Sequence, residues 1–159
     1  MWLRRVAAAG AASILLTYGT AGAQVLMERD VSLRMALTIA QTALAQCGDN
    51  TIVAVVDRAG RMKAFLQGDH ANPHNIELAR RKAYTARTFR VPSAEWAKRT
   101  ETNPGQRYLT DVIPLGGGMP INVGTETIGG VGLSGAAGGQ EQEEACATAG
   151  IAKVADQLK

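Results

Sequence analysis

Two histidines, His70 and His74, are the only imidazole side chains in this chain, and they stand four residues apart around an Asn-Pro pair. Imidazole binds transition metals and haem iron. A structural zinc site needs four ligands, whereas Asp69 is the one obvious further ligand nearby. Pro73 also places one histidine in a loop and the other in the first turn of a predicted helix. The spacing therefore favours one axial ligand to haem over zinc. The alternative is a ligand-free turn in which His74 packs over the next helical turn.

Four basic residues follow the histidines in the same predicted helix: Arg80, Arg81, Lys82 and Arg87. Haem carries propionate carboxylates, and basic side chains bind carboxylates through charge-assisted hydrogen bonds. We therefore expect this helix to supply the groups that hold the propionates of a bound haem. Aromatic residues make up only 4% of the chain. That low content counts against a large haem pocket, because ligand pockets are usually lined with bulky apolar groups.

Glycine is concentrated in residues 115–139, which read LGGGMPINVG and then TETIGGVGLSGAAGG. These segments lack the patterns of a dinucleotide-binding loop, a phosphate-binding P-loop and a nucleophile elbow. A Ser-His-Asp triad has no supporting pattern either. Glycine within a strand marks close approach by another backbone or by a ligand, which is what we expect here. Gly138 and Gly139 also precede a predicted helix, whose free N–H groups could hold an anion.

Residues 1–23 have the pattern of a secretory signal peptide. Arg4 and Arg5 precede a short apolar run, and an Ala-Gly-Ala site ends at Ala23. The run is too short and interrupted for a confident membrane span; an N-terminal anchor or amphipathic helix is the alternative. We predict a periplasmic or secreted protein that begins at Gln24 and has no stable membrane span after cleavage.

Cleavage also changes the charge of the protein. The formal charge of +3 loses two arginines and becomes 15 − 14 = +1. No run of basic residues alternates with aromatic residues, so the sequence predicts no nucleic-acid binding. Hydrophobic residues make up 46% of the chain and charged residues 19%. This composition supports a folded core and does not indicate disorder.

The two cysteines, Cys47 and Cys146, both lie in the predicted mature chain. An even cysteine count in an exported protein favours a disulfide, and two buried free thiols are the alternative. Neither cysteine belongs to a C-x-x-C pair, so redox catalysis is disfavoured. The C-x-x-C-H motif is also missing, which excludes covalent c-type haem attachment by that motif.

Hydrophobic periodicity predicts one α+β domain over residues 24–159. A helix with Ser32 as its cap and Gly48 at its end is followed by the strand TIVAVVD, which is apolar on both faces and is therefore central in the sheet. RMKAFLQ returns as the second strand of a hairpin. Asn72 then caps a helix that begins at Pro73, and Ser93 caps a short helix. About three strands and a closing helix complete an antiparallel sheet with packed helices.

Four segments, VAVVDRAGRMKAFLQGD, RRKAYTARTF, GGGMPI and IGGVGLSGAAGGQEQEEACATAG, occur in an order that resembles the GlcG/HbpS-type haem-binding family. The resemblance covers nearly all of residues 24–159. It implies a five-stranded antiparallel sheet flanked by helices, assembled into dimers or larger homo-oligomers. Five residues occupy the positions of the family's KAxTAxxF helix motif: Lys82, Ala83, Thr85, Ala86 and Phe89.

The resemblance implies a haem-binding protein, and the signal-peptide pattern predicts that it is exported. We take His74 and then His70 as candidate axial ligands, with Met119 or Tyr84 as possible second ligands. Further candidates for the ligand pocket are Arg81, Lys82, Thr85, Met119 and Ser134. Two alternatives stay open: a protein or enzyme that binds a small organic ligand through the glycine-rich loops, and a structural oligomeric subunit. No catalytic residue is predicted.

Overall fold

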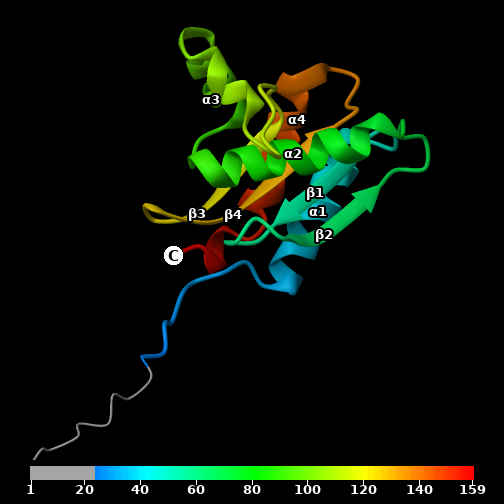
Figure 1. Ribbon diagram of the computed structural model, residues 1–159. Helices are drawn as coiled ribbons and strands as arrows, with labels where there is room; N and C mark the ends of the chain where they lie inside the picture. Colours follow the sequence, from blue (N-terminus) through cyan, green and yellow to red (C-terminus); the bar gives the residue numbers. More distant parts are fainter. Residues whose placement is uncertain (1–23) are drawn as a thin grey trace, which may run out of the picture.

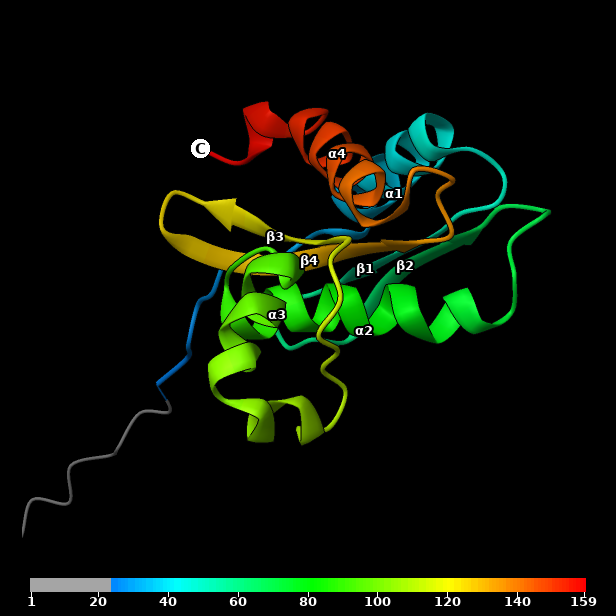
Figure 2. The same cartoon turned by 90° about the horizontal axis from the view of Figure 1, so that it is seen from above.

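The computed structural model describes residues 24–159. Four strands form one antiparallel sheet in the order β2-β1-β4-β3. Helices α1 and α4 cover one face, and α2 and α3 lie on the other (Figure 1 and Figure 2). In chain order the elements are α1 (Leu33–Cys47), β1 (Ile52–Val56), β2 (Met62–Gln67), α2 (His74–Phe89), α3 (Ser93–Thr102), the 3-10 helix η1 (Pro104–Tyr108), β3 (Gly118–Val123), β4 (Glu126–Ser134), α4 (Gly139–Ala152) and the 3-10 helix η2 (Ala155–Gln157).

The α+β class and the single antiparallel sheet are confirmed, but the sheet of the described residues has four strands and not five. Instead of three strands, the chain after α3 forms η1, a loop, and then β3 and β4. At the end of the loop the Gly117 carbonyl accepts the Leu133 N–H of β4 at 2.9 Å, but the loop otherwise bonds mainly to helices. Its Ile113 N–H donates to Thr85 Oγ1 of α2 at 2.9 Å, and its Gly117 N–H donates to Glu144 of α4 at 3.2 Å. These side-chain acceptors satisfy the backbone without a fifth strand.

β1 lies inside the sheet, as its two apolar faces predicted, and all five of its residues are buried. Val53 and Val55 pack in the larger core with α1 and α4, whereas Ile52 and Ala54 face α2. Burial of the strand on both faces fixes its register, because a shift of one residue would exchange the two sets of side chains. The sheet therefore presents a defined apolar face to α2.

Glycines on the α2 face of the sheet let the helix backbone come close to the strands. A Cβ on Gly132 would lie 2.3 Å from the carbonyl oxygen of Ala79, and one on Gly130 would lie 2.4 Å from that of Ala83. Gly118, the β3 partner of Gly132, has the same kind of contact with α2. Close approach by another backbone, one of the two explanations expected for these glycines, is confirmed.

The predicted disulfide is confirmed. Cys47 at the end of α1 is bonded to Cys146 in α4, across a sequence separation of 99 residues. Cys146 is buried in the larger core, beside Ala147. The bridge therefore joins the two helices that cover one face of the sheet.

Helix starts differ slightly from the predicted ones. Ser32 caps α1 as expected, since its hydroxyl accepts a hydrogen bond from Met35 N–H at 3.2 Å. Pro73, and not Asn72, is the cap residue of α2. Ser93 is the first residue of α3 and not its cap, because its hydroxyl accepts the Gly118 N–H of β3 at 2.8 Å. A tertiary contact here replaces the local one that the sequence indicated.

The signal peptide predicted for residues 1–23 lies outside the described residues. Between residues 24 and 159, no helix has the length and hydrophobicity needed to cross a bilayer. Residues 24–32 have no regular structure and lead into α1. Export and cleavage therefore stay predictions.

Candidate functional site

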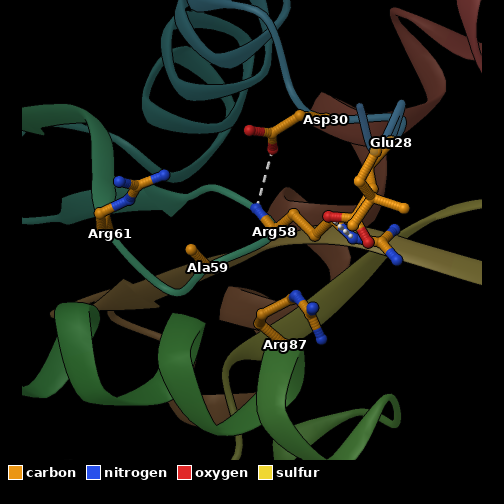
Figure 3. Close-up of a pocket in the computed structure, with 7 residues that line it drawn as sticks. Glu28, Asp30, Arg58, Ala59, Arg61 and Arg87 are labelled. Carbon is orange, nitrogen blue, oxygen red and sulfur yellow. Dashed lines mark hydrogen bonds and ion pairs between the residues drawn. The ribbon is translucent and has the colours of Figure 1, made fainter. Parts of the chain in front are cut away.

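The candidate site is a cavity of about 390 Å³ with three arginines in its wall, called here the arginine pocket. It lies between the segment before α1, the turn from β1 to β2, and the last turns of α2 (Figure 3). Its lining residues are Leu26, Glu28, Asp30, Arg58, Ala59, Arg61 and Arg87. A cavity of this size can hold a small ligand or part of a larger one.

A tight turn positions two of the arginines. Asp57 Oδ1 accepts hydrogen bonds from the N–H groups of Ala59 and Arg61, each at 2.9 Å. Gly60 closes the turn with a φ of 76°, in the left-handed region where glycine is favoured. Its N–H donates to the carbonyl of Asp57 at 2.9 Å. The DRAG sequence therefore holds Arg58 and Arg61 on either side of Ala59.

Arg58 has several partners. Its guanidinium pairs with Glu28 at 3.1 Å and also with Glu126 of β4, and its backbone N–H donates to Asp30 at 2.8 Å. The hydrogen bond with Glu126 raises the pKa of Arg58 above its ordinary value, and the negative charge of Glu28 acts in the same direction. Arg58 is therefore held firmly, and its charge is compensated.

Arg87 differs, because no ion pair or hydrogen bond to its guanidinium is found within residues 24–159. Its Nε is buried and has no hydrogen-bond partner in that range. Burial lowers the pKa of Arg87, and the positive charges of Arg58 and Arg90 lower it further. Since no acceptor within residues 24–159 pairs with the Arg87 guanidinium, an anion in the pocket can bind it without displacing another partner.

A second, smaller depression of about 230 Å³ adjoins the arginine pocket and shares Arg58, Ala59 and Arg87 with it. Tyr84, one helical turn before Arg87, also lines this depression. The tyrosine ring lies directly over Gly60, where a Cβ would be 2.7 Å from Tyr84 Cε2. The glycine therefore serves both the turn and the placement of the phenol.

Comparison with known proteins identifies the family. The family profile described as "Haem degrading protein HbpS-like" matches residues 29–152. The chain belongs to the HbpS-like family. It is 32% identical to HbpS in a crystal structure, with a TM-score of 0.79, and the match covers 84% of this chain and 96% of HbpS. A double mutant of Streptomyces reticuli HbpS is 31% identical, with a TM-score of 0.78 and coverages of 90% and 97%.

The fold also matches a complex of PduOC with heme, at 23% identity and a TM-score of 0.68, over 77% of this chain and 93% of PduOC. At that identity the likeness concerns the fold alone. No curated protein matches the sequence. The family resemblance predicted from the motifs is confirmed.

Three of the four basic residues expected to hold propionates already have partners in this HbpS-like chain. Arg80 pairs with Glu77 and with Asp111, the latter at 2.6 Å. Arg81 donates to a backbone carbonyl of the loop before β3. Lys82 Nζ lies 2.6 Å from a carboxylate oxygen of Glu143 in α4.

The pair of Lys82 and Glu143 is buried, with 3% and 4% of the residues exposed. The second carboxylate oxygen of Glu143 accepts the Gly135 N–H at 2.8 Å. Gly117 leaves room for the pair, because a Cβ there would lie 2.4 Å from Glu143 Oε2 and 3.1 Å from Lys82 Nζ. The pair therefore ties α2 to α4 next to the start of β3 and the end of β4.

The other pocket candidates of the HbpS-like chain also make internal contacts. Thr85 is fully buried and accepts from Ile113, and Ser134 donates to Asn75 Oδ1 at 3.0 Å. Met119 packs against the core on the opposite side of the sheet, with α1 and α4. None of the three lines the arginine pocket.

Both histidines are exposed at the N-terminal end of α2 and do not line the arginine pocket. His70 Nδ1 lies 3.7 Å from Asp49 Oδ2. In residues 24–159, no group of three or more His, Cys, Asp and Glu side chains is placed to hold a metal ion. The two histidines stay candidate ligands, but the pocket is at the other end of the helix.

Sequence reasoning named Arg87 and Tyr84 but missed most of the arginine pocket. Glu28, Arg58 and Arg61 were not predicted as site residues, because each lies in a segment that looks like an ordinary loop or turn. The hairpin of TIVAVVD and RMKAFLQ was predicted, yet nothing local shows that its turn faces the end of α2. The only signal in the sequence was the presence of two arginines around a well-formed turn.

Proposed function

We propose that this HbpS-like chain is an exported haem-binding protein whose arginine pocket binds the haem propionates. The observation that carries the proposal is Arg87, whose Nε is buried without an acceptor in the described residues and whose side chain lines the pocket. A propionate would accept hydrogen bonds from this guanidinium and from Arg61 or Arg58. The relation to HbpS, and the description of PduOC as a heme complex, support haem as the ligand.

The iron ligand is a separate question, because His74 and Arg87 lie at opposite ends of α2. Thirteen residues separate them, which corresponds to roughly 20 Å along the helix axis and about 140° around it. We therefore expect a haem bound at Arg87 to take its ligand from elsewhere than His74 of the same chain. Tyr84 lies beside Arg87, and tyrosine can ligate haem iron. Bound haem would supply an iron centre, and the chain would supply its ligand and its charge partners.

A homo-oligomer would complete such a site. The apolar residues among those lining the arginine pocket are Leu26 and Ala59, which is little surface for a porphyrin. A second copy of the chain could supply the missing apolar wall. The disulfide supports export, because such bonds persist in oxidising compartments.

The same observation favours a second candidate function, the binding of a small organic anion. The pocket is lined mainly by charged groups, and its volume of about 390 Å³ suits a small carboxylate or phosphate ester. Such a ligand would need Arg87 but no iron ligand. The two functions therefore differ in their dependence on Tyr84, His70 and His74.

Haemin titration of the protein purified from an exporting host tests the proposal. The Arg87→Gln variant is expected to bind haemin about 10- to 100-fold more weakly, because a charged hydrogen bond is worth about 1.5–3 kcal/mol. Arg99→Gln is the matched control, since Arg99 lies on the exposed face of α3 in a pair with Glu95. Mass spectrometry of the same preparation shows whether the chain begins at Gln24.

Three further variants identify the iron ligand: His70→Ala, His74→Ala and Tyr84→Phe. The variant that changes the Soret band without abolishing binding marks the ligand. Saturable binding near one haem per chain, weakened by Arg87→Gln and not by Arg99→Gln, supports the proposal. Unsaturable binding, or equal affinity in both arginine variants, would contradict it.

A further inference from the structure

We propose that Glu28 is a built-in occupant of the arginine pocket, whose carboxylate is replaced at Arg58 when an anionic ligand binds. The ligand class is a carboxylate or phosphate group with at least two acceptor oxygens. The exchange frees the segment before Asp30, so that ligand binding is coupled to release of the N-terminal strap, residues 24–29. This inference rests on the assignment of the arginine pocket as an anion site in the proposed function.

Glu28 already occupies the place of an anion at Arg58. Its Oε2 lies 3.1 Å from Arg58 Nε, and the glutamate is one of the residues that line the pocket. The glutamate side chain is 44% exposed, and exposed ion pairs contribute little stability. A ligand carboxylate can therefore replace it with little loss.

Arg58 keeps its position when Glu28 leaves, because its other contacts come from different parts of the chain. Glu126 of β4 binds the other side of the guanidinium. Asp30 Oδ1 accepts the Arg58 N–H at 2.8 Å (Figure 3). The arginine is thus preorganised, and a ligand does not have to order it.

Exchange is favourable because a ligand can contact Arg87 as well. No ion pair joins Glu28 to Arg87 in the part of the chain that the structure describes, and Arg87 Nε has no acceptor there. Figure 3 shows Arg87 rising from α2 on the side of the pocket opposite Glu28, with Arg58 between them. An anion between the two arginines would satisfy both guanidinium groups, whereas Glu28 satisfies only one.

The strap can leave without disturbing the core. Val31 is buried, and Asp30 Oδ1 also accepts its N–H at 2.7 Å, so the chain is anchored at this point. Before it, the ion pairs of the strap are Glu28 with Arg58 and Arg29 with Glu126, the latter at 3.6 Å. Three apolar residues of the strap are exposed by 76–87%: Val25, Leu26 and Met27. Little apolar burial therefore holds the strap in place.

The test compares Glu28→Gln with Glu101→Gln, a matched control at an exposed position of α3. Affinity is measured for two probes, inorganic phosphate and haemin. Glu28→Gln is expected to bind both about two- to fivefold more tightly, which corresponds to the loss of one competing surface ion pair. Glu101→Gln is expected to match the unaltered chain.

A second readout follows the strap itself. Trypsin cleavage after Arg29 is expected to become faster when phosphate or haemin is added to the unaltered chain. In Glu28→Gln it is expected to be fast without either probe. In the Arg87→Gln variant, neither phosphate nor haemin is expected to speed up cleavage after Arg29, because the exchange depends on the Arg87 guanidinium.

The outcomes separate this inference from the proposed function. If haemin fails to bind but phosphate binds more tightly to Glu28→Gln, the haem proposal fails and the inference stands. If haemin binding depends on Arg87 while Glu28→Gln has unchanged or weaker affinity for both probes, the inference fails alone. If neither phosphate nor haemin binds to the unaltered chain or to any variant, both the proposed function and this inference are overturned.

Discussion

Replacing Lys82 by methionine is expected to lower the free energy of unfolding by about 3–5 kcal/mol. The ammonium group is buried and lies 2.6 Å from Glu143, which is itself only 4% exposed. Without the lysine, the buried carboxylate keeps its hydrogen bond from Gly135 but loses its counter-charge. Urea unfolding followed by the fluorescence of buried Trp96 measures the change.

The double variant Lys82→Met/Glu143→Leu separates the cost of an unpaired charge from the worth of the pair. We expect it to recover most of the lost stability, because apolar replacement of a buried ion pair is often neutral. Arg99→Gln, which breaks an exposed pair, should change stability by less than about 1 kcal/mol. A double variant as unstable as the single one would show that the pair itself stabilises the packing of α2 on α4.

Lys82 was predicted as a pocket residue, so the same variants test a functional role. The structural placement predicts that the double variant binds haemin as tightly as the unaltered chain, since neither residue lines the arginine pocket. Weaker haemin binding in a double variant of normal stability would show that Lys82 contributes to the ligand site, as the sequence predicted. Stability and affinity must therefore be measured on the same preparations.

Reduction of the disulfide is expected to lower the free energy of unfolding by about 4–5 kcal/mol in the chain-entropy estimate for a loop of this length. The bond joins the end of α1 to α4 across 99 residues of sequence, so it restricts a large part of the unfolded chain. Urea unfolding with and without a phosphine reductant measures the difference.

The Cys47→Ala/Cys146→Ala variant is the control for packing. Cys146 is buried in the core, so the variant loses packing of the sulfur atoms as well as the cross-link. Reduced protein keeps both sulfur atoms and isolates the effect of the cross-link. Equal stability of the oxidised and reduced chains would contradict the prediction.

Much of the fold was predictable from local patterns. The apolar faces of TIVAVVD predicted a strand inside the sheet, and β1 lies between β2 and β4. Ser32 was recognised as the cap of α1 from its position before a periodic apolar run. An even cysteine count, taken with an exported chain, predicted the bond between Cys47 and Cys146. Each of these features can be recognised from residues close in sequence or from composition.

The strand count was less predictable, because it depends on where the backbone of residues 109–117 finds its partners. The sequence of this loop contains an apolar group, Val112 and Ile113, that is compatible with a short strand. Thr85 of α2 and Glu144 of α4 accept its N–H groups instead. Both acceptors are about 28 residues away in sequence, and local propensity has no information about them.

The sequence by itself determined the family, the α+β class and the basic character of α2, and it favoured a disulfide between its two cysteines. Only the tertiary structure decided which basic residue has no partner: Arg80, Arg81 and Lys82 all find acceptors, and within residues 24–159 Arg87 Nε does not. Only the structure brought Glu28 and Arg58 together with Arg87 in one pocket. The physical reason is that a charge is compensated by its neighbours in space, and those neighbours come from segments that no local pattern connects.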